Sequence, residues 1–292
     1  MNIKTLLVAV DLLADNKAFL QKTFRFVNFI KCSVILIYVK EEMHLYDYFT
    51  HTETVGDDEL ELRLKNVKGK FKENGINVVD AIFTKGRPHK VICENADKLD
   101  VNAVLLSTGE NFHEKRLIGN TADKIIRMAN QNIILINQFK ETYSNKVVCA
   151  YDFSESSKFA LKLSKEFSDL SQRKLSVLHV INKIYFSSAV YGSNHSRHDH
   201  LAKIEKVETA AGHRLEESAA SVLENIDEID FIVQQGIPAV QICGTVKKQH
   251  ADWLFLGASG HNSFVKMFMG STVEEVYRTA ATNIFILKNN MS

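Results

Sequence analysis

The stretch Gly86-Arg-Pro-His-Lys-Val-Ile-Cys93 recurs as Gly236-Ile-Pro-Ala-Val-Gln-Ile-Cys243, and these two stretches hold both prolines of the chain. The offset is 150 residues (236 − 86), and glycine, proline, isoleucine and cysteine recur in step. Proline costs a helix little in the first turn, where its missing N–H would have no partner. Each stretch therefore predicts a helix that starts just after a glycine, and the pair predicts two copies of one domain.

Other residues recur in the same order along the chain. They are Asp11 with Asp152, Gly109 with Gly260, and Gly119 with Gly270, at offsets of 141 (152 − 11), 151 (260 − 109) and 151 (270 − 119). A repeat this long indicates duplicated whole domains, since the units of solenoid proteins span about 20–50 residues. We therefore expect domains at residues 1–138 and 145–292, with an extra polar stretch at 187–200 in the second copy.

The hydrophobic pattern of each copy predicts five strands that alternate with four helices. Strands that are almost wholly apolar and alternate with amphipathic helices are typical of a parallel sheet covered on both faces. The fold class is thus α/β, with two tandem, doubly wound domains of five parallel strands each. The apolar runs lie at 3–10, 33–39, 76–83, 102–107 and 132–137, and at 146–151, 175–180, 231–234, 253–257 and 283–288.

Composition excludes several classes of partner. The 292 residues are 45% hydrophobic and 24% charged with a net charge of +1, and neither half has the basic stripe of a nucleic-acid-binding protein. No apolar run approaches the roughly 20 residues that span a bilayer, and the N-terminus has no signal-peptide pattern. The four cysteines are scattered without a CxxC pair, which favours reduced thiols that serve packing. We therefore expect a cytoplasmic protein that binds neither nucleic acid nor membrane.

Ligands of open α/β sheets bind beyond the carboxyl ends of the strands. In the second copy the first strand runs into Tyr151-Asp-Phe-Ser-Glu-Ser-Ser157, an acid followed by a helix start that Ser154 or Ser156 could cap. The fourth strand runs into Gly257-Ala-Ser-Gly260 and, nine residues later, Gly270-Ser-Thr272 at a helix start. A glycine lets backbone approach a ligand closely, and free N–H groups at a helix N-terminus attract an anion. No Walker sequence is present, so a P-loop site is excluded on this segment.

The spacing glycine, two residues, glycine, nine residues, glycine and then serine resembles the universal stress protein family. Gly257, Gly260, Gly270 and Ser271 match that motif without a gap, and both copies resemble the family from the opening strand to the last. The resemblance implies a sheet order of 3-2-1-4-5 in each copy. It also implies that the two copies pair with each other and that two chains could form a homodimer.

Carried over by position, the resemblance puts Asp152 near a ribose and the backbone at Val180 against an adenine. It puts phosphates among the residues of the glycine motif, and implies ATP, possibly with Mg²⁺ held by Asp152, Ser271 and Thr272. The residues alone imply an anion, whereas adenine and ATP come from the resemblance. The full candidate set is Ala150, Tyr151, Asp152, Val180, Leu256, Gly257, Gly260, Gly270, Ser271 and Thr272.

The first copy departs from the motif. Counting back from Gly109 puts Leu106 at the position of Gly257, and Asn120 stands at that of Ser271. Gly109 and Gly119 remain, but a structural turn would keep them too. We therefore expect a degenerate nucleotide motif in the first copy and an intact one in the second.

Two alternatives to ATP binding remain open from the sequence. The chain could be an interaction module whose cleft is empty or holds another small ligand, or an enzyme of the wider group of adenine-nucleotide α-hydrolases. No catalytic triad, nucleophile elbow or arginine finger is evident, so at most a slow ATPase is expected. The stretch from His195 to His200 could offer imidazoles to a metal, but a lid or partner surface is the preferred interpretation.

Overall fold

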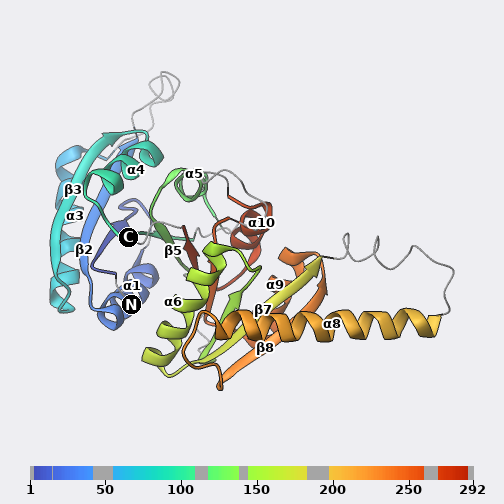
Figure 1. Cartoon of the computed structure of the whole chain (residues 1–292). Helices are drawn as coiled ribbons and strands as arrows, with labels where there is room; N and C mark the ends of the chain where they lie inside the picture. The colour runs from blue at the N-terminus through green and yellow to red at the C-terminus, as the bar shows by residue number, and fades with distance from the viewer. Residues whose placement is uncertain are drawn as a thin grey trace, which may run out of the picture. The chain divides into compact units, whose positions relative to one another are not determined.

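The chain divides into two compact units, Met1–Phe139 with Asn290–Ser292 and Lys140–Asn289. The computed structural model describes residues 3–14, 16–41, 55–108, 118–137, 144–182, 197–259 and 269–288, with 197–204 as backbone alone. Each unit is a parallel sheet flanked by helices (Figure 1).

In the first unit the strand order is β3-β2-β1-β4-β5, and the pairings recorded among these strands are parallel. Helices α1 and α3 follow the first two strands, and α4 and α5 the next two. The bounds are β1 Thr5–Ala9, α1 Lys17–Ile30, β2 Ser33–Glu41, α3 Asp57–Glu73, β3 Val78–Gly86, α4 Pro88–Lys98, β4 Ala103–Ser107, α5 Asn120–Met128 and β5 Asn132–Ile136.

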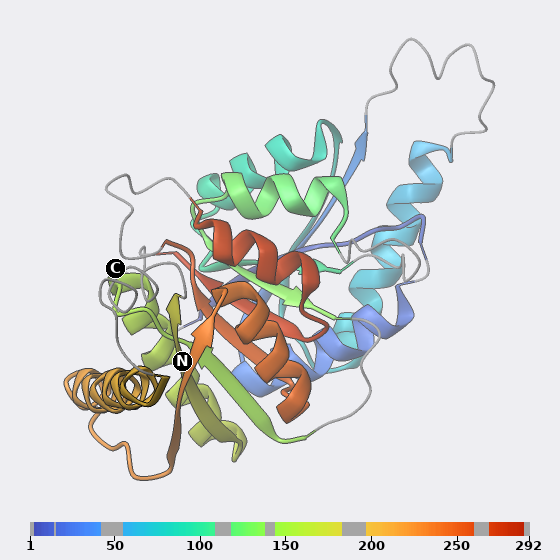
Figure 2. The ribbon, with the colours of Figure 1, turned by 90° about the vertical axis from the view of Figure 1, so that its right-hand side faces the viewer.

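The second unit repeats this plan with the strand order β8-β7-β6-β9-β10, again with parallel pairings. Both units therefore have the order 3-2-1-4-5, which confirms the predicted fold class. Right-handed crossovers place α6 and α8 on one face of this sheet and α9 and α10 on the other (Figure 2). The bounds are β6 Lys146–Ala150, α6 Glu155–Ser171, β7 Lys174–Asn182, α8 Arg197–Ala220, β8 Ile229–Gly236, α9 Pro238–Gln249, β9 Trp253–Gly257, α10 Ser271–Thr279 and β10 Asn283–Leu287.

The central strands form the core because both faces of each sheet are covered. Leu6, Leu7 and Val8 of β1 have no exposed surface, and the same holds for Val147 and Val148 of β6. Such uniformly apolar strands are expected in a parallel sheet between two helical layers. In these two central strands, polar residues are confined to the ends.

The repeated glycine–proline stretches mark the same junction in both units. Gly86 and Gly236 have φ angles of +138° and +143°, a region that side chains disfavour. A Cβ on Gly236 would also lie 2.6 Å from Nε2 of Gln241. Pro88 and Pro238 then occupy the first turns of α4 and α9. The prediction of a helix start after each glycine is therefore confirmed.

Strand register corrects the sequence alignment of the two copies at one position. In the first unit Leu6 pairs with Ala103, and in the second its equivalent Val147 pairs with Trp253. By this register the residue of the first unit that corresponds to Gly257 is Ser107. Leu106 corresponds to Leu256, and these two leucines are equally buried. The alignment from Gly109 was wrong because the segment between strand and glycine is one residue shorter in the first copy.

No helix within the described ranges is both long and apolar enough to cross a bilayer.

Candidate functional site

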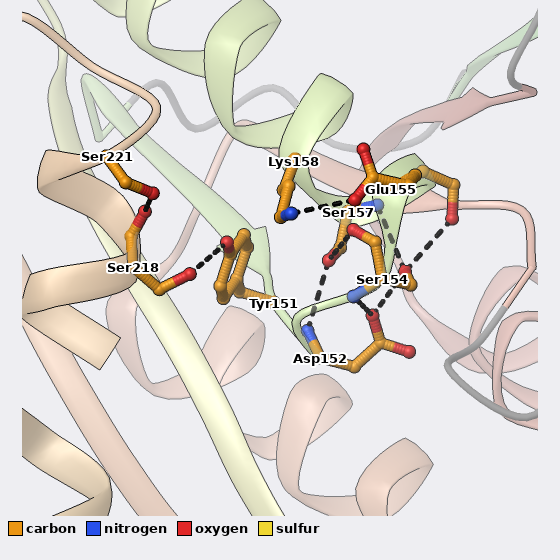
Figure 3. Close-up of polar contacts among 9 residues, drawn as sticks. Tyr151, Asp152, Ser154, Glu155, Ser157, Lys158, Ser218 and Ser221 are labelled. Atoms are coloured by element: carbon orange, nitrogen blue, oxygen red, sulfur yellow. Dashed lines mark hydrogen bonds and ion pairs between the residues drawn. The ribbon is translucent and has the colours of Figure 1, made fainter. Parts of the chain in front are cut away.

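The carboxyl end of β6 leads into a hydrogen-bonded turn that starts α6 (Figure 3). Ser154 has extended backbone angles, and its hydroxyl accepts a hydrogen bond from the Ser157 amide at 3.2 Å. Oδ1 of Asp152 accepts from the Ser154 amide at 3.0 Å and from the Ser154 hydroxyl. Ser154 is thus the N-cap of α6. The sequence had offered Ser154 or Ser156 for this role.

Asp152 and its equivalent Asp11 have the same structural role. Oδ1 of Asp11 accepts hydrogen bonds from the amides of Leu13 and Ala14 at 2.9 and 3.3 Å. Each aspartate therefore stabilises the turn after the first strand of its unit. Asp152 is exposed, and no described residue hydrogen-bonds to its Oδ2. That oxygen can accept from a ligand without disturbing the turn.

Gly257, at the end of β9, lies directly against the first turn of α6. A Cβ at this position would lie 2.6 Å from the Ser157 amide nitrogen and 2.7 Å from the Ser156 carbonyl carbon. The Ser156 hydroxyl also donates to the Ser259 carbonyl at 2.5 Å, which fastens the start of α6 to the segment after β9. Glycine is required here by the close approach of a helix, whereas the sequence argument attributed it to a ligand.

The segment after β9 also contacts the start of α10. Gly270 is the N-cap of this helix, and its amide donates to the Ala258 carbonyl at 3.0 Å. Among the described residues no side chain caps α10, and Ser271 is exposed while Thr272 is half-buried. The first amides of a helix have no partner within it and carry the positive end of the helix dipole. This uncapped N-terminus can accept an anion.

The other predicted site residues are buried, half-buried or outside the described part of the chain. Tyr151 and Leu256 are only 2% and 3% exposed, so their side chains are packed in the protein and are not available to a ligand. Val180 on β7 and Ala150 at the end of β6 are half-buried. Gly260 lies outside the described residues. One corner is therefore formed by the start of α6, the end of β9 at Gly257, and the start of α10 at Gly270 and Ser271. The Asp152 turn adjoins this corner because Asp152 hydrogen-bonds to Ser154, the cap of α6.

A group of side chains beside this corner was missed by the sequence analysis. The ring of Phe153 contacts the rings of Tyr151 and His179 and the guanidinium of Arg214. The Tyr151 hydroxyl shares a 2.7 Å hydrogen bond with Ser218 of α8 (Figure 3). The available signal was the arginine that recurs before each third strand, as Arg63 and Arg214, 151 residues apart (214 − 63).

His179 is held neutral by its surroundings. Burial lowers its pKa below the ordinary 6.5, and the charge of Arg214 acts in the same direction. The hydrogen bond from Nδ1 to the Tyr151 carbonyl, 2.9 Å long, and the charge of Asp152 oppose this shift. The folded protein therefore binds this proton at lower pH than the unfolded chain does.

This difference predicts an acid-labile second unit. The stability that neutral His179 contributes is fully present above pH 6.5 and is lost as the pH falls through the lowered pKa of the folded state. We expect His179→Asn, which keeps a donor for the Tyr151 carbonyl, to lose less stability than the parent between pH 7.5 and pH 5. Urea unfolding followed by the fluorescence of Trp253, the single tryptophan, measures this.

His89 of the first unit also has a lowered pKa, mainly through burial. This histidine is present in both the parent protein and the His179→Asn variant. The difference between parent and variant therefore isolates His179. Equal acid sensitivity in the two proteins would contradict the assignment.

The cysteines lie in apolar surroundings, as expected. Cys32, Cys93 and Cys149 are buried, and Cys243 is half-buried. Burial raises the pKa of Cys32 and of Cys149 to about 12, and that of Cys243 to about 11. These three thiols are protonated at neutral pH and are weak nucleophiles.

The first unit lacks the corresponding helix start. Helix α1 begins at Lys17, which is equivalent to Lys158, the fourth residue of α6. The N-cap of α1, Asn16, makes no side-chain cap bond to the described residues. Leu13 stands at the position of Ser154 and is 61% exposed. By this numbering α6 begins three residues earlier than α1, at Glu155, so the first helical turn that lies against Gly257 has no helical counterpart among residues 12–14 and 16.

The described residues contain no group of three or more His, Cys, Asp or Glu side chains placed to bind a metal. His195 lies outside the described part, and of residues 197–200 only the helical backbone is described.

The chain is thus a tandem pair of doubly wound α/β domains, the second of which has an α10 start without a described side-chain cap. The model of the universal stress protein family matches residues 2–137 and 144–288, so the chain belongs to this family, twice over. A curated relative, universal stress protein MJ0577 of Methanocaldococcus jannaschii, is 26% identical over 163 residues, covering 50% of this chain and 96% of the relative.

Two solved structures show the fold across nearly the whole chain. A universal stress protein from Archaeoglobus fulgidus has 20% identity and a TM-score of 0.67, covering 99% of this chain and 100% of that one. A functionally unknown protein from Pseudomonas aeruginosa PAO1 has 14% identity and a TM-score of 0.71, covering 98% and 92%. At these identities the likeness concerns the fold alone.

Proposed function

We propose that the second unit binds ATP and that the protein acts in the response to stress through this ligand. The observation that carries the proposal is the corner itself. The end of β9, the capped start of α6 and the uncapped start of α10 meet where the family motif has its glycines. Phosphates would bind the first amides and hydroxyls of α10, and the free Oδ2 of Asp152 would face the ribose.

The residues also fit a phosphate-bound Mg²⁺. Asp152, Ser271 and Thr272 supply the oxygen ligands that this ion prefers, and Mg²⁺ would offset the negative charge of the phosphates when bound. No described arginine stands in the corner, and Glu155 is paired with Lys158 at 2.7 Å. At most a slow hydrolysis is therefore proposed, and the ligand would act by stabilising one conformation over another.

The first unit supports a second candidate function for that half. It has Ser107 for the strand-end glycine, Asn120 for Ser271, and an N-cap of α1, Asn16, that makes no side-chain cap bond to the described residues. We propose that this unit is an interaction module. We also propose, from the family resemblance, that the two units pair and that two chains form a homodimer, and, from the scattered cysteines, that the protein acts in the cytoplasm. Ultracentrifugation of the full chain tests the homodimer.

The experiment that tests nucleotide binding is mass spectrometry of small molecules released from the purified, heat-denatured protein. We expect about one ATP or ADP per chain, because a single intact motif predicts a single site. If none is found, and calorimetry with added ATP and Mg²⁺ shows no binding, the interaction-module interpretation replaces this one for the whole chain.

A further inference from the structure

Each unit carries an arginine at the same place in the helix before its third strand, Arg63 in α3 and Arg214 in α8. Both reach the turn after the first strand of their unit. Nη1 of Arg63 donates to the Leu12 carbonyl at 2.9 Å, and the guanidinium carbon of Arg214 lies 4.4 Å from the ring centroid of Phe153. Leu12 and Phe153 are equivalent, since each directly follows the repeated aspartate.

The two turns differ in backbone conformation. Phe153 has a φ of +67°, in the left-handed region, whereas Leu12 has no positive φ. An aromatic residue is strained there, and such strain persists only where the surroundings hold it. Four other positive φ angles recur in both units after helices and so belong to the shared fold: Lys31 with Gln172, and Asp100 with His250. Asn145, just before β6, also has a positive φ of 55° without a counterpart in the first unit, but asparagine adopts this conformation readily. The strained residue is specific to the unit with the intact motif.

Three side chains surround the Phe153 ring. The ring of His179 lies 4.7 Å away and that of Tyr151 5.3 Å away, both edge to face, and Arg214 covers the ring from α8. Tyr151 is itself tied to α8 through Ser218. Helix α8 therefore contacts this turn at two points, of which Arg214 is the one that touches the strained residue.

We propose that Arg214 is a positioning residue of the nucleotide site, acting through Phe153. By holding Phe153 in the left-handed conformation, it fixes the Asp152 carboxylate on one side of that residue and the Ser154 cap on the other. The inference rests on the proposed function, because it assigns the turn to ligand binding. It adds a residue from α8, which lies outside the family motif, to the determinants of affinity.

The first test compares equivalent substitutions in the two units. We expect Arg214→Met to weaken ATP binding about fivefold, the size of an exposed cation–π contact. Arg63→Met makes the same chemical change in the first unit and is expected to leave the affinity unchanged. Arg214→Lys should restore most of it, since an ammonium can also lie over the ring. Equal losses from Arg63→Met and Arg214→Met would overturn the proposal.

The second test separates action through Phe153 from direct contact with the ligand. Glycine adopts positive φ without strain, so in a Phe153→Gly background the turn no longer needs the arginine. Arg214→Met should then have no further effect on ATP affinity. A further fivefold loss in this background would show direct action on the ligand. Phe153→Asn, which also tolerates this conformation, replaces glycine if that variant folds poorly.

The third test needs no ligand. Hydrogen exchange by mass spectrometry, on the full chain without nucleotide, should show faster exchange at residues 152–157 in Arg214→Met than in Arg63→Met. If the exchange rates at residues 152–157 are the same in both variants, Arg214 does not hold this turn, and the proposal is overturned whatever the ATP affinities are. A parent protein that binds no ATP refutes the proposed function, and the exchange result still decides whether Arg214 holds the turn.

Discussion

Gly257→Ala is expected to lower the free energy of unfolding of the second unit by about 2–3 kcal/mol, a large effect for one methyl group. The added carbon would lie 2.6 Å from the Ser157 amide nitrogen, where backbone atoms cannot move aside without displacing the first turn of α6. The same displacement would disturb the Ser154 cap and the Asp152 turn. We therefore expect ATP affinity to fall with stability. Urea unfolding followed by Trp253 fluorescence and calorimetry measure the two losses.

Gly244→Ala is the matched control. Gly244 lies in the interior of α9 in the same unit, and a Cβ there would meet nothing within 4 Å. Alanine should stabilise this helix by about 0.5–1 kcal/mol and leave ATP binding unchanged. If Gly257→Ala were as well tolerated as Gly244→Ala, the close packing of β9 against α6 would be refuted.

Ser271→Asp is expected to weaken ATP binding by about 100-fold while the fold stays intact. A carboxylate in the first turn of α10 interacts favourably with the helix dipole, by about 0.3–1 kcal/mol. The same charge would face the phosphates, and like charges brought together at a binding site cost several kcal/mol. Affinity and stability should thus change in opposite directions, which a simple folding defect cannot produce.

Asn120→Asp makes the equivalent change at the start of α5 in the first unit. We expect it to leave the stoichiometry and affinity for ATP unchanged, because the proposed site lies in the second unit. Calorimetric titrations of both variants give the comparison. Parent-like affinity in Ser271→Asp would show that the phosphates do not bind at α10.

Much of the fold could be predicted because its signals are local. Apolar runs and helical periodicity determined the five strands, and the glycine–proline stretches identified Gly86 and Gly236 as helix junctions. The equivalence of Leu106 and Gly257 was wrong because it was counted from loop glycines. Strand register depends on pairing between distant segments, and a one-residue change in a loop leaves no local sign.

The candidate site could likewise be predicted only where short-range interactions determine it. Ser154 could be recognised as a cap from its place before a helix, since capping is a short-range interaction. The contact of Gly257 with Ser156 joins residues about 100 positions apart and is a property of tertiary packing. Phe153 gave no warning of its left-handed conformation, because aromatic residues rarely adopt it and nothing in the neighbouring sequence requires it.

The buried thiols have a consequence for how such a protein could respond to stress. Oxidation by peroxide proceeds through the thiolate, and the raised pKa values of Cys32, Cys149 and Cys243 leave almost none of it at neutral pH. These residues are therefore poor redox sensors and are also protected from oxidative damage. These three thiols are therefore suited to staying reduced when peroxide is present, and under the proposed function a response to stress would come from the bound ligand and not from thiol oxidation.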